Sequence, residues 1–164
     1  MELTEIQKTF ILHWGEMGSK WGINRAMAQI HALLLVSEKP LNAQDISEAL
    51  NLARSNVSTG LRDLQSWKII KLIHLMGDRR EHYEADKDVW NALSLIAERR
   101  IDQEIAPTIE ILKSLQANKS SSASQKQLFA DFIDIFENSI SFFKKIQKLP
   151  VKLIRKLWKT PRFF

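Results

Sequence analysis

The hydrophobic pattern of this chain departs from helical spacing in one short stretch, and that stretch limits the folds the chain can adopt. On both sides of it, apolar residues recur at steps of three and four, which is typical of amphipathic helices. Residues 69–75, IIKLIHL, are β-branched and extended, and residues 81–85, EHYEA, form a return strand after a turn at residues 76–80. We therefore expect a mainly α-helical protein with one small β-hairpin.

Four helices are expected before the hairpin. Gly22 stops the first, and Asn24 and Asn42 are good N-caps for the second and third. The predicted spans are residues 3–21, 24–37, 43–50 and 55–67. The order of helix, short helix, turn, helix and hairpin across residues 24–85 predicts a winged helix-turn-helix, a fold that binds double-stranded DNA.

The fourth helix is predicted to pack with one face and to offer the other to a DNA groove. Val57, Leu61 and Leu64 lie at i, i+4 and i+7 and form the inner face. The opposite face carries short hydroxyl and amide side chains that bond phosphates or base edges, and Arg62 reaches guanine or phosphate. Gly60 is expected to allow close approach to the preceding helix. The predicted DNA-binding residues of this segment are Arg54, Ser55, Asn56, Ser58, Thr59 and Arg62.

The turn of the hairpin carries Arg79 and Arg80, which predict a wing that enters the minor groove. That groove is narrow and electronegative, so it attracts arginine. Asp78 is placed to hold one arginine in a fixed rotamer through a bidentate ion pair. The alternative is that residues 78–80 form only a solvated turn; their position after a polar-faced helix favours the wing.

After residue 85 the pattern is helical again and predicts dimerisation. One long helix runs from Val89 to Ala117, and Pro107 either kinks it or restarts it. Residues 118–124, NKSSSAS, form a predicted loop before a last helix. The apolar stripe of that helix includes Phe132, Phe136 and Phe143. Such stripes need a partner surface, so we expect a stable homodimer built on long dimerisation helices.

The charge is unevenly distributed over the predicted regions. These are an N-terminal helix for dimer or ligand contacts (1–23), the DNA-binding domain (24–85), a helical dimerisation region (86–147) and a basic amphipathic tail (148–164). Residues 138–164 hold eight basic residues and no acid, while the other 16 basic and 19 acidic residues leave the rest at a net charge of −3. The net charge of +5 is therefore no argument for DNA binding. The tail suits an anionic membrane surface, but packing on the dimer or a flexible tail is favoured.

The sequence offers no support for catalysis, a cofactor or a metal site. It lacks cysteine and contains no His-Glu-x-x-His, P-loop or glycine-rich nucleotide motif. Asp131 and Asp134 lie one helical turn apart among phenylalanines, where the solvated edge of a helix is favoured over a metal site. The start of the chain has no signal-peptide pattern, and no apolar run approaches the ~20 residues of a membrane span. We therefore expect a cytoplasmic protein that is not an enzyme.

Two segments resemble the GbsR branch of the MarR-type winged-helix regulators. They are LNAQDISEALNLARSNVSTGLRDLQSWKII (41–70) and GDRREHYEADKDVW (77–90), and the resemblance covers roughly residues 3–117. It implies a homodimer on a palindromic operator, and an association with genes for choline and glycine-betaine uptake and synthesis. By position, it implies a recognition-helix role for Ser55, Asn56, Ser58, Thr59 and Arg62 and a wing role for Arg79 and Arg80. Lys68 departs from the family, which usually has a glycine closing this helix.

The aromatic residues of the first helix leave two interpretations. Phe10, Trp14 and Trp21 share one stripe, and packing in the core or the dimer is favoured. The alternative is a cage for a quaternary ammonium effector such as choline or glycine betaine, since ring faces attract cations by ~0.5–2 kcal/mol each. The family resemblance adds support to this alternative.

The predicted function is a ligand-modulated transcription repressor. The competing function is a protein-interaction or membrane-surface module that uses the winged helix as a platform and the basic tail as an anchor.

Overall fold

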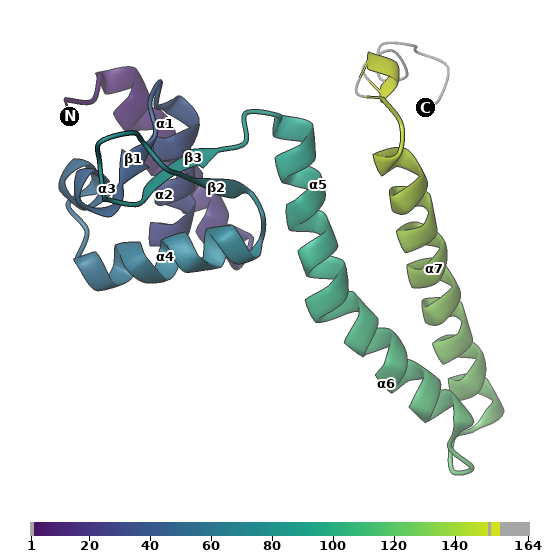
Figure 1. Ribbon diagram of the computed structural model, residues 1–164. Coiled ribbons are helices and arrows are strands. Elements are labelled where there is room, and N and C mark those ends of the chain that lie inside the picture. The colour runs from purple at the N-terminus through teal and green to yellow at the C-terminus, as the bar shows by residue number, and fades with distance from the viewer. Residues whose placement is uncertain (1, 151, 155–164) are drawn as a thin grey trace. The chain divides into compact units, whose positions relative to one another are not determined.

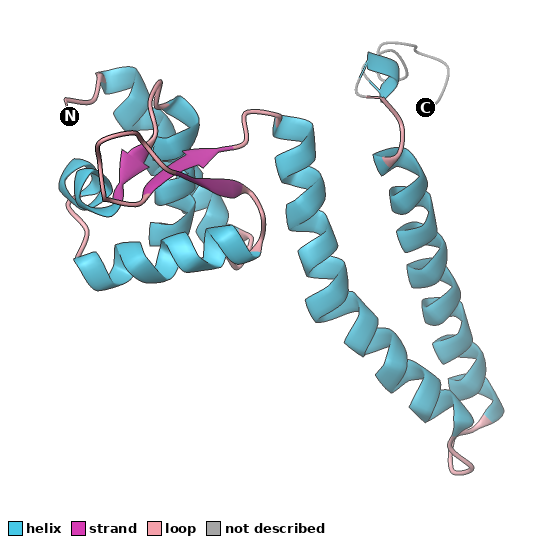
Figure 2. Ribbon diagram, in the orientation of Figure 1, coloured by secondary structure: helices cyan, strands magenta, loops and turns pink. Residues whose placement is uncertain are grey.

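A computed structural model describes residues 2–150 and 152–154 and shows mainly helices with one small sheet (Figure 1). The chain forms two compact units, Met1–Leu95 and Ile96–Phe164. The elements are α1 (Glu5–Lys20), α2 (Arg25–Val36), β1 (Leu41–Asn42), α3 (Ala43–Leu50), α4 (Arg54–Ser66), β2 (Ile70–Ile73), β3 (His82–Ala85), α5 (Val89–Arg100), the π-helix η1 (Ile101–Ile105), α6 (Ala106–Ala117) and α7 (Ala123–Gln147). The predicted fold class is confirmed: the chain is mainly helical, with a small antiparallel sheet whose β2–β3 hairpin follows α4 as a wing (Figure 2).

Short-range capping sets the starts of the first three helices. Thr4 and Gln7 form a capping box at α1, with the Thr4 N–H donating to Gln7 Oε1 at 3.0 Å. Asn24 Oδ1 accepts a bond from a backbone N–H of the first turn of α2 at 3.2 Å, and Asn42 forms a second capping box with Asp45 at α3. The two predicted asparagine caps are therefore confirmed, because a cap depends only on residues within about one turn.

The wing is an antiparallel sheet with the strand order β1-β3-β2. Leu72 of β2 lies opposite Tyr83 of β3, and on the other edge of β3 Leu41 lies opposite the same tyrosine. The predicted hairpin is confirmed with shorter strands. β1 was not predicted, because two residues cannot show an alternating pattern. It ties α3 to the wing, since Asn42 pairs with His82 and also caps α3.

The core of the first unit lies around α2, which contacts both α1 and α4. Ile30 and Leu33 of α2 are fully buried. A Cβ on Gly60 of α4 would lie 2.7 Å from Ile30 Cδ1 and 3.5 Å from Met27 Cα. Gly60 therefore closely approaches α2. The prediction that it approaches the preceding helix, α3, was wrong, because α4 packs across the central helix of the unit.

The end of α4 carries a lysine in a conformation that favours glycine. Lys68 has a φ of 60°, and its N–H donates to the Gln65 carbonyl at 2.9 Å. A glycine enters this left-handed region without steric penalty, whereas an L side chain costs roughly 1–2 kcal/mol. The helix thus ends with the backbone geometry a glycine would favour, although the sequence places a lysine there.

In the second unit, α6 and α7 pack against each other. Pro107 lies in the first turn of α6, directly after the π-helical turn η1. The backbone on both sides of η1 stays in the right-handed helical region, so the helix continues through this proline and does not restart there. α7 begins after a capping box of Ser122 and Gln125, so the predicted loop ends earlier than residue 124. In the tail, residues 152–154 are helical, and residues 151 and 155–164 lie outside the described residues. No helix in the described part of the chain is long and apolar enough to cross a membrane.

Candidate nucleic-acid interface

The outer face of α4 is exposed and polar. Val57 is fully buried, and Leu61 and Leu64 are also buried, so the predicted inner face packs in the core. The predicted interface residues on this helix, all exposed, are Arg54, Ser55, Asn56, Ser58, Thr59 and Arg62. Among residues 2–150 and 152–154, neither Arg54 nor Arg62 takes part in an ion pair. This face therefore offers hydroxyl groups, an amide and two unpaired guanidinium groups.

Asp78 and Arg80 are locked together at the turn of the wing. Arg80 Nε donates to Asp78 Oδ1 at 3.0 Å and Arg80 Nη2 to Oδ2 at 2.6 Å, while the Arg80 N–H donates to Oδ1 at 2.9 Å. The bidentate geometry expected for Asp78 is thus present. The side-chain hydrogen bond from Arg80 is the main reason that the pKa of Asp78 lies well below its ordinary value.

The two wing arginines differ in what surrounds them. Arg80 is held by Asp78, so its guanidinium has a fixed direction and a partly neutralised charge. Arg79 is exposed, and no ion pair to it is present in the described part of the chain. The sequence predicted that Asp78 holds one of the two arginines, and that arginine is Arg80. The structure makes Arg79 the available cation and Arg80 the one that braces the turn.

His82 contacts the residues of this turn and was not among the predicted site residues. It is 4% exposed, its Nδ1 lies 3.0 Å from the Arg80 carbonyl oxygen, and its Nε2 lies 3.6 Å from Asp78 Oδ2. Nδ1 must donate to that carbonyl, so the ring fixes the backbone at Arg80. A histidine two residues after the second arginine is the only sequence sign of this contact, and local spacing does not show that it is buried.

A hollow of about 410 Å³ joins α4 to the wing. Its lining comes from the starts of α3 and α4 and from the wing, namely Asn42, Ala43, Gln44, Arg54, Ser58, Arg80, Glu81 and Tyr83. The Glu81 carboxylate already has a hydrogen-bond partner within the first unit, because the Tyr83 hydroxyl donates to its Oε2 at 2.7 Å. Burial, together with this bond, raises the pKa of Tyr83 to about 12. The hollow therefore brings Arg54 of α4 and Arg80 of the wing to one surface.

The aromatic residues of α1 are brought together only in part. The Phe10 and Trp14 rings are stacked with centroids 5.5 Å apart, and Trp14 also lies against the buried His31 at 6.4 Å. Trp21 is the C-cap of α1 and is 47% exposed. Among the described ring contacts, none joins it to the other two. Two of the three proposed cage residues are therefore neighbours, and the third stands apart.

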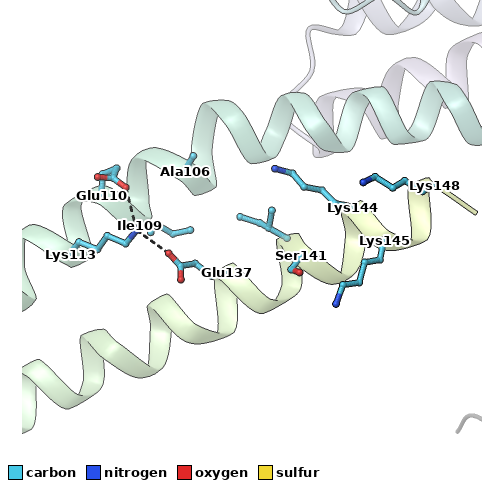
Figure 3. Close-up of a pocket in the computed structure, with 10 residues that line it drawn as sticks. Ala106, Ile109, Glu110, Lys113, Glu137, Ser141, Lys144, Lys145 and Lys148 are labelled. Carbon is cyan, nitrogen blue, oxygen red and sulfur yellow. Dashed lines mark ion pairs between the residues drawn. The ribbon is translucent and has the colours of Figure 1, made fainter.

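A second hollow, of about 530 Å³, lies between α6 and α7 (Figure 3). At one end Lys113 pairs with Glu137 at 2.9 Å, a hydrogen bond that raises the pKa of Lys113. At the other end α7 contributes Lys144, Lys145 and Lys148, which form no ion pair with any described residue. The apolar part of the lining is Ala106, Ile109 and Ile140. This concentration of positive charge makes the hollow unsuitable for a cationic effector.

The paired aspartates of α7 behave as surface residues. Asp131 accepts a bond from Gln127 at 2.8 Å, and Asp134 accepts one from Asn138 at 2.9 Å. All four are exposed along the helix. No group of three or more His, Asp or Glu side chains within the described residues is placed to hold a metal ion.

Of the comparisons with known proteins, the one with solved structures identifies proteins of similar fold. No protein-family model matches the chain, and no curated protein sequence matches it. A crystal structure of a transcriptional regulator, 17% identical, matches 87% of this chain and 95% of its own with a TM-score of 0.70. The complex of S. aureus MepR with DNA (18% identity, 84% and 99% covered) has a TM-score of 0.41, and a ZitR mutant from Lactococcus lactis (13%, 85% and 77%) has 0.31. The first likeness shows that the chain shares the fold of that structure.

Proposed function

We propose that this protein is a DNA-binding transcription repressor that acts as a homodimer. The observation that carries the proposal is the polar, cation-bearing outer face of α4 beside a wing whose turn presents Arg79. A helix of this kind fits the major groove, and a wing arginine fits the adjacent minor groove. The competing function, a protein-docking platform, would need exposed apolar side chains on α4, and its outer face has no large apolar residue.

The hollow between α4 and the wing supports this docking mode. When α4 lies in the major groove and the wing in the neighbouring minor groove, the strand that separates the two grooves crosses between them. Arg54, Ser58 and Gln44 line that path and carry hydrogen-bond donors. We therefore assign these side chains to phosphate contacts, which set the register of the protein, and the middle of α4 to base contacts, which supply specificity.

The decisive experiment is a map of bound DNA followed by titration. A genome-wide map with the full chain identifies its strongest site, and the purified protein is then titrated against that duplex and a scrambled duplex at two salt concentrations. Specific binding should exceed binding to the scrambled duplex by ~10³-fold or more, and log affinity should fall linearly with log salt. Equal affinity for the two duplexes would refute a sequence-specific regulator.

The exposed apolar residues of the second unit support the homodimer. α6 and α7 leave large side chains in solvent although the two helices already pack together, namely Ile111, Leu115, Leu128, Phe132, Ile135 and Phe142. Phe142 is 66% exposed and Ile135 is 60% exposed. Sets of exposed apolar residues of this kind mark interaction surfaces, and a two-fold axis would let each copy cover the other.

We expect a dimeric mass in sedimentation at micromolar concentration. Ile135→Asp and Phe142→Asp should each shift the protein toward a monomer, because a carboxylate would be buried in the interface. Asn138→Asp adds the same charge at an exposed polar position of α7 and should leave the mass unchanged. A monomeric mass for the unaltered protein, with its helical circular dichroism intact, would contradict the dimer.

We further propose a quaternary ammonium effector, choline or glycine betaine, bound at α1. Support comes from the family resemblance of the sequence and from the stacked rings of Phe10 and Trp14, whose faces suit such a group. Trp21 lies apart from them, so it is the weaker candidate. An effector that alters DNA affinity must bind two dimer arrangements unequally, and the effect is reciprocal.

Calorimetry with choline and with glycine betaine tests this site. Heat is expected for the unaltered protein and should be lost in Trp14→Ala and reduced less in Trp21→Ala. No heat with the unaltered protein refutes both compounds. Heat that survives both substitutions places the effector elsewhere and returns Phe10, Trp14 and Trp21 to a packing role.

A further inference from the structure

The tip of the wing exposes apolar side chains beside its arginines. Met76 is fully exposed, at 105% of its reference area, and Leu75 before it is 39% exposed. Gly77 follows with a φ of 82°, and a Cβ built on it would meet nothing within 4 Å. In this position the methionine contributes none of the stability that burial of an apolar side chain provides.

The turn that carries Met76 is braced at its base. The Asp78 N–H donates to the Leu75 carbonyl at 3.2 Å, which closes the turn around Met76 and Gly77. Asp78 is held in turn by Arg80, and the backbone at Arg80 is held by the buried His82. Met76 is therefore presented at the apex of a bonded turn, between strand β2 and the exposed Arg79.

We propose that Met76 is a wedge that inserts between base pairs in the minor groove, so that the protein bends its operator. The inference rests on the proposed DNA binding. Arg79 draws the tip into the electronegative groove. An apolar side chain that arrives there has no hydrogen bond to make with base edges, and its favourable place is between two partly unstacked base pairs. The continuity of the tip with the arginine wing favours DNA as the occupant over a protein partner.

A wedge of this kind restricts the base step that can lie opposite the wing. Unstacking a base step costs free energy, and it is easiest at the flexible pyrimidine–purine steps, TA and CA/TG. The operator should therefore carry such a step in the minor groove opposite each wing, at a position where no side chain reads a base edge. Replacing it with a stiff A-tract should weaken binding even though every base that α4 contacts is kept.

The test places 2-aminopurine, which brightens when it unstacks, at the step opposite the wing in the mapped operator. The full chain, Met76→Ala and Met76→Leu are compared at saturating protein, together with bending measured by circular-permutation gel shift. We expect a fluorescence rise and a bend with the unaltered chain and with Met76→Leu, and loss of both with Met76→Ala. Because Met76 is fully exposed, neither substitution disturbs the core.

Arg79→Gln is the matched control, since it removes the neighbouring charge and keeps the apolar tip. It should reduce the salt slope by about one and, at saturation, keep the fluorescence rise, whereas Met76→Ala should keep the slope and lose the rise. An equal rise and bend with Met76→Ala overturn the wedge and leave the proposed function standing. Failure of the unaltered chain to bind any duplex overturns the proposed function itself, and the wedge with it.

Discussion

Arg62→Ala should weaken binding of the full chain to its DNA site by ~1–3 kcal/mol, the usual cost of one lost base contact. Arg62 is exposed on the outer face of α4, which is polar, while Val57 and Leu64 of the same helix are buried in the core. Its removal therefore leaves the fold intact. If Arg62 bonds a phosphate instead, the salt slope falls by about one and the loss is the same for specific and scrambled duplexes.

The double variant Arg79→Ala, Arg80→Ala should weaken binding at least as much, for two different reasons. Arg79 is the unpaired cation and contacts the groove directly. Arg80 acts through the turn, and its removal also leaves the Asp78 carboxylate uncompensated next to the phosphates. Gel-shift titration at two salt concentrations measures both effects.

Lys8→Ala is the control for these losses. Lys8 is an exposed cation of α1 that is already paired with Glu5 at 2.7 Å, so its removal should leave the affinity and the salt slope unchanged. Full affinity in both Arg62→Ala and the double arginine variant, with normal circular dichroism, would remove α4 and the wing from the DNA interface.

The folded protein should lose stability as the pH falls from about 6.5 toward 4, because of His31. This side chain of α2 is 3% exposed and lies against Trp14 of α1, and its Nε2 has no hydrogen-bond partner among the described residues. Burial lowers the pKa of His31 from 6.5 to about 4. As the pH falls, the unfolded chain therefore binds the proton first. The contribution of the neutral, buried His31 to the free energy of unfolding is fully present above about pH 6.5 and is lost as the pH falls toward 4. Its full size is up to about 3 kcal/mol.

Urea unfolding at fixed protein concentration and several pH values measures this loss. His31→Leu should flatten the dependence between pH 6.5 and 4 and remove the cost of an unpaired buried nitrogen. His13→Leu is the matched control, because His13 is an exposed histidine of α1 and its replacement should leave the dependence in place. An equal pH dependence in the unaltered protein and His31→Leu would show that another group is responsible.

The sequence alone determined the parts of this protein that depend on short-range physics. Asn24 and Asn42 cap their helices because a cap joins side chain and backbone within one turn. The inner and outer faces of α4 follow from the period of the helix, so the exposed residues around Arg62 were predictable by position. The ion pair between Asp78 and Arg80 also belongs here, since the two are separated by one residue.

Tertiary structure decided whatever depends on residues distant in the chain. β1 exists because β3 offers it a free edge, and Gly60 faces α2 because α4 crosses the centre of the unit. His31 is buried because α1 packs against it, and nothing in the helical pattern of α2 distinguishes it from a surface histidine. Trp21 shares a stripe with Phe10 and Trp14, yet it caps the helix end and stays half-exposed. Periodicity gives the direction of a side chain about its own helix, while the group that meets it there comes from elsewhere in the fold.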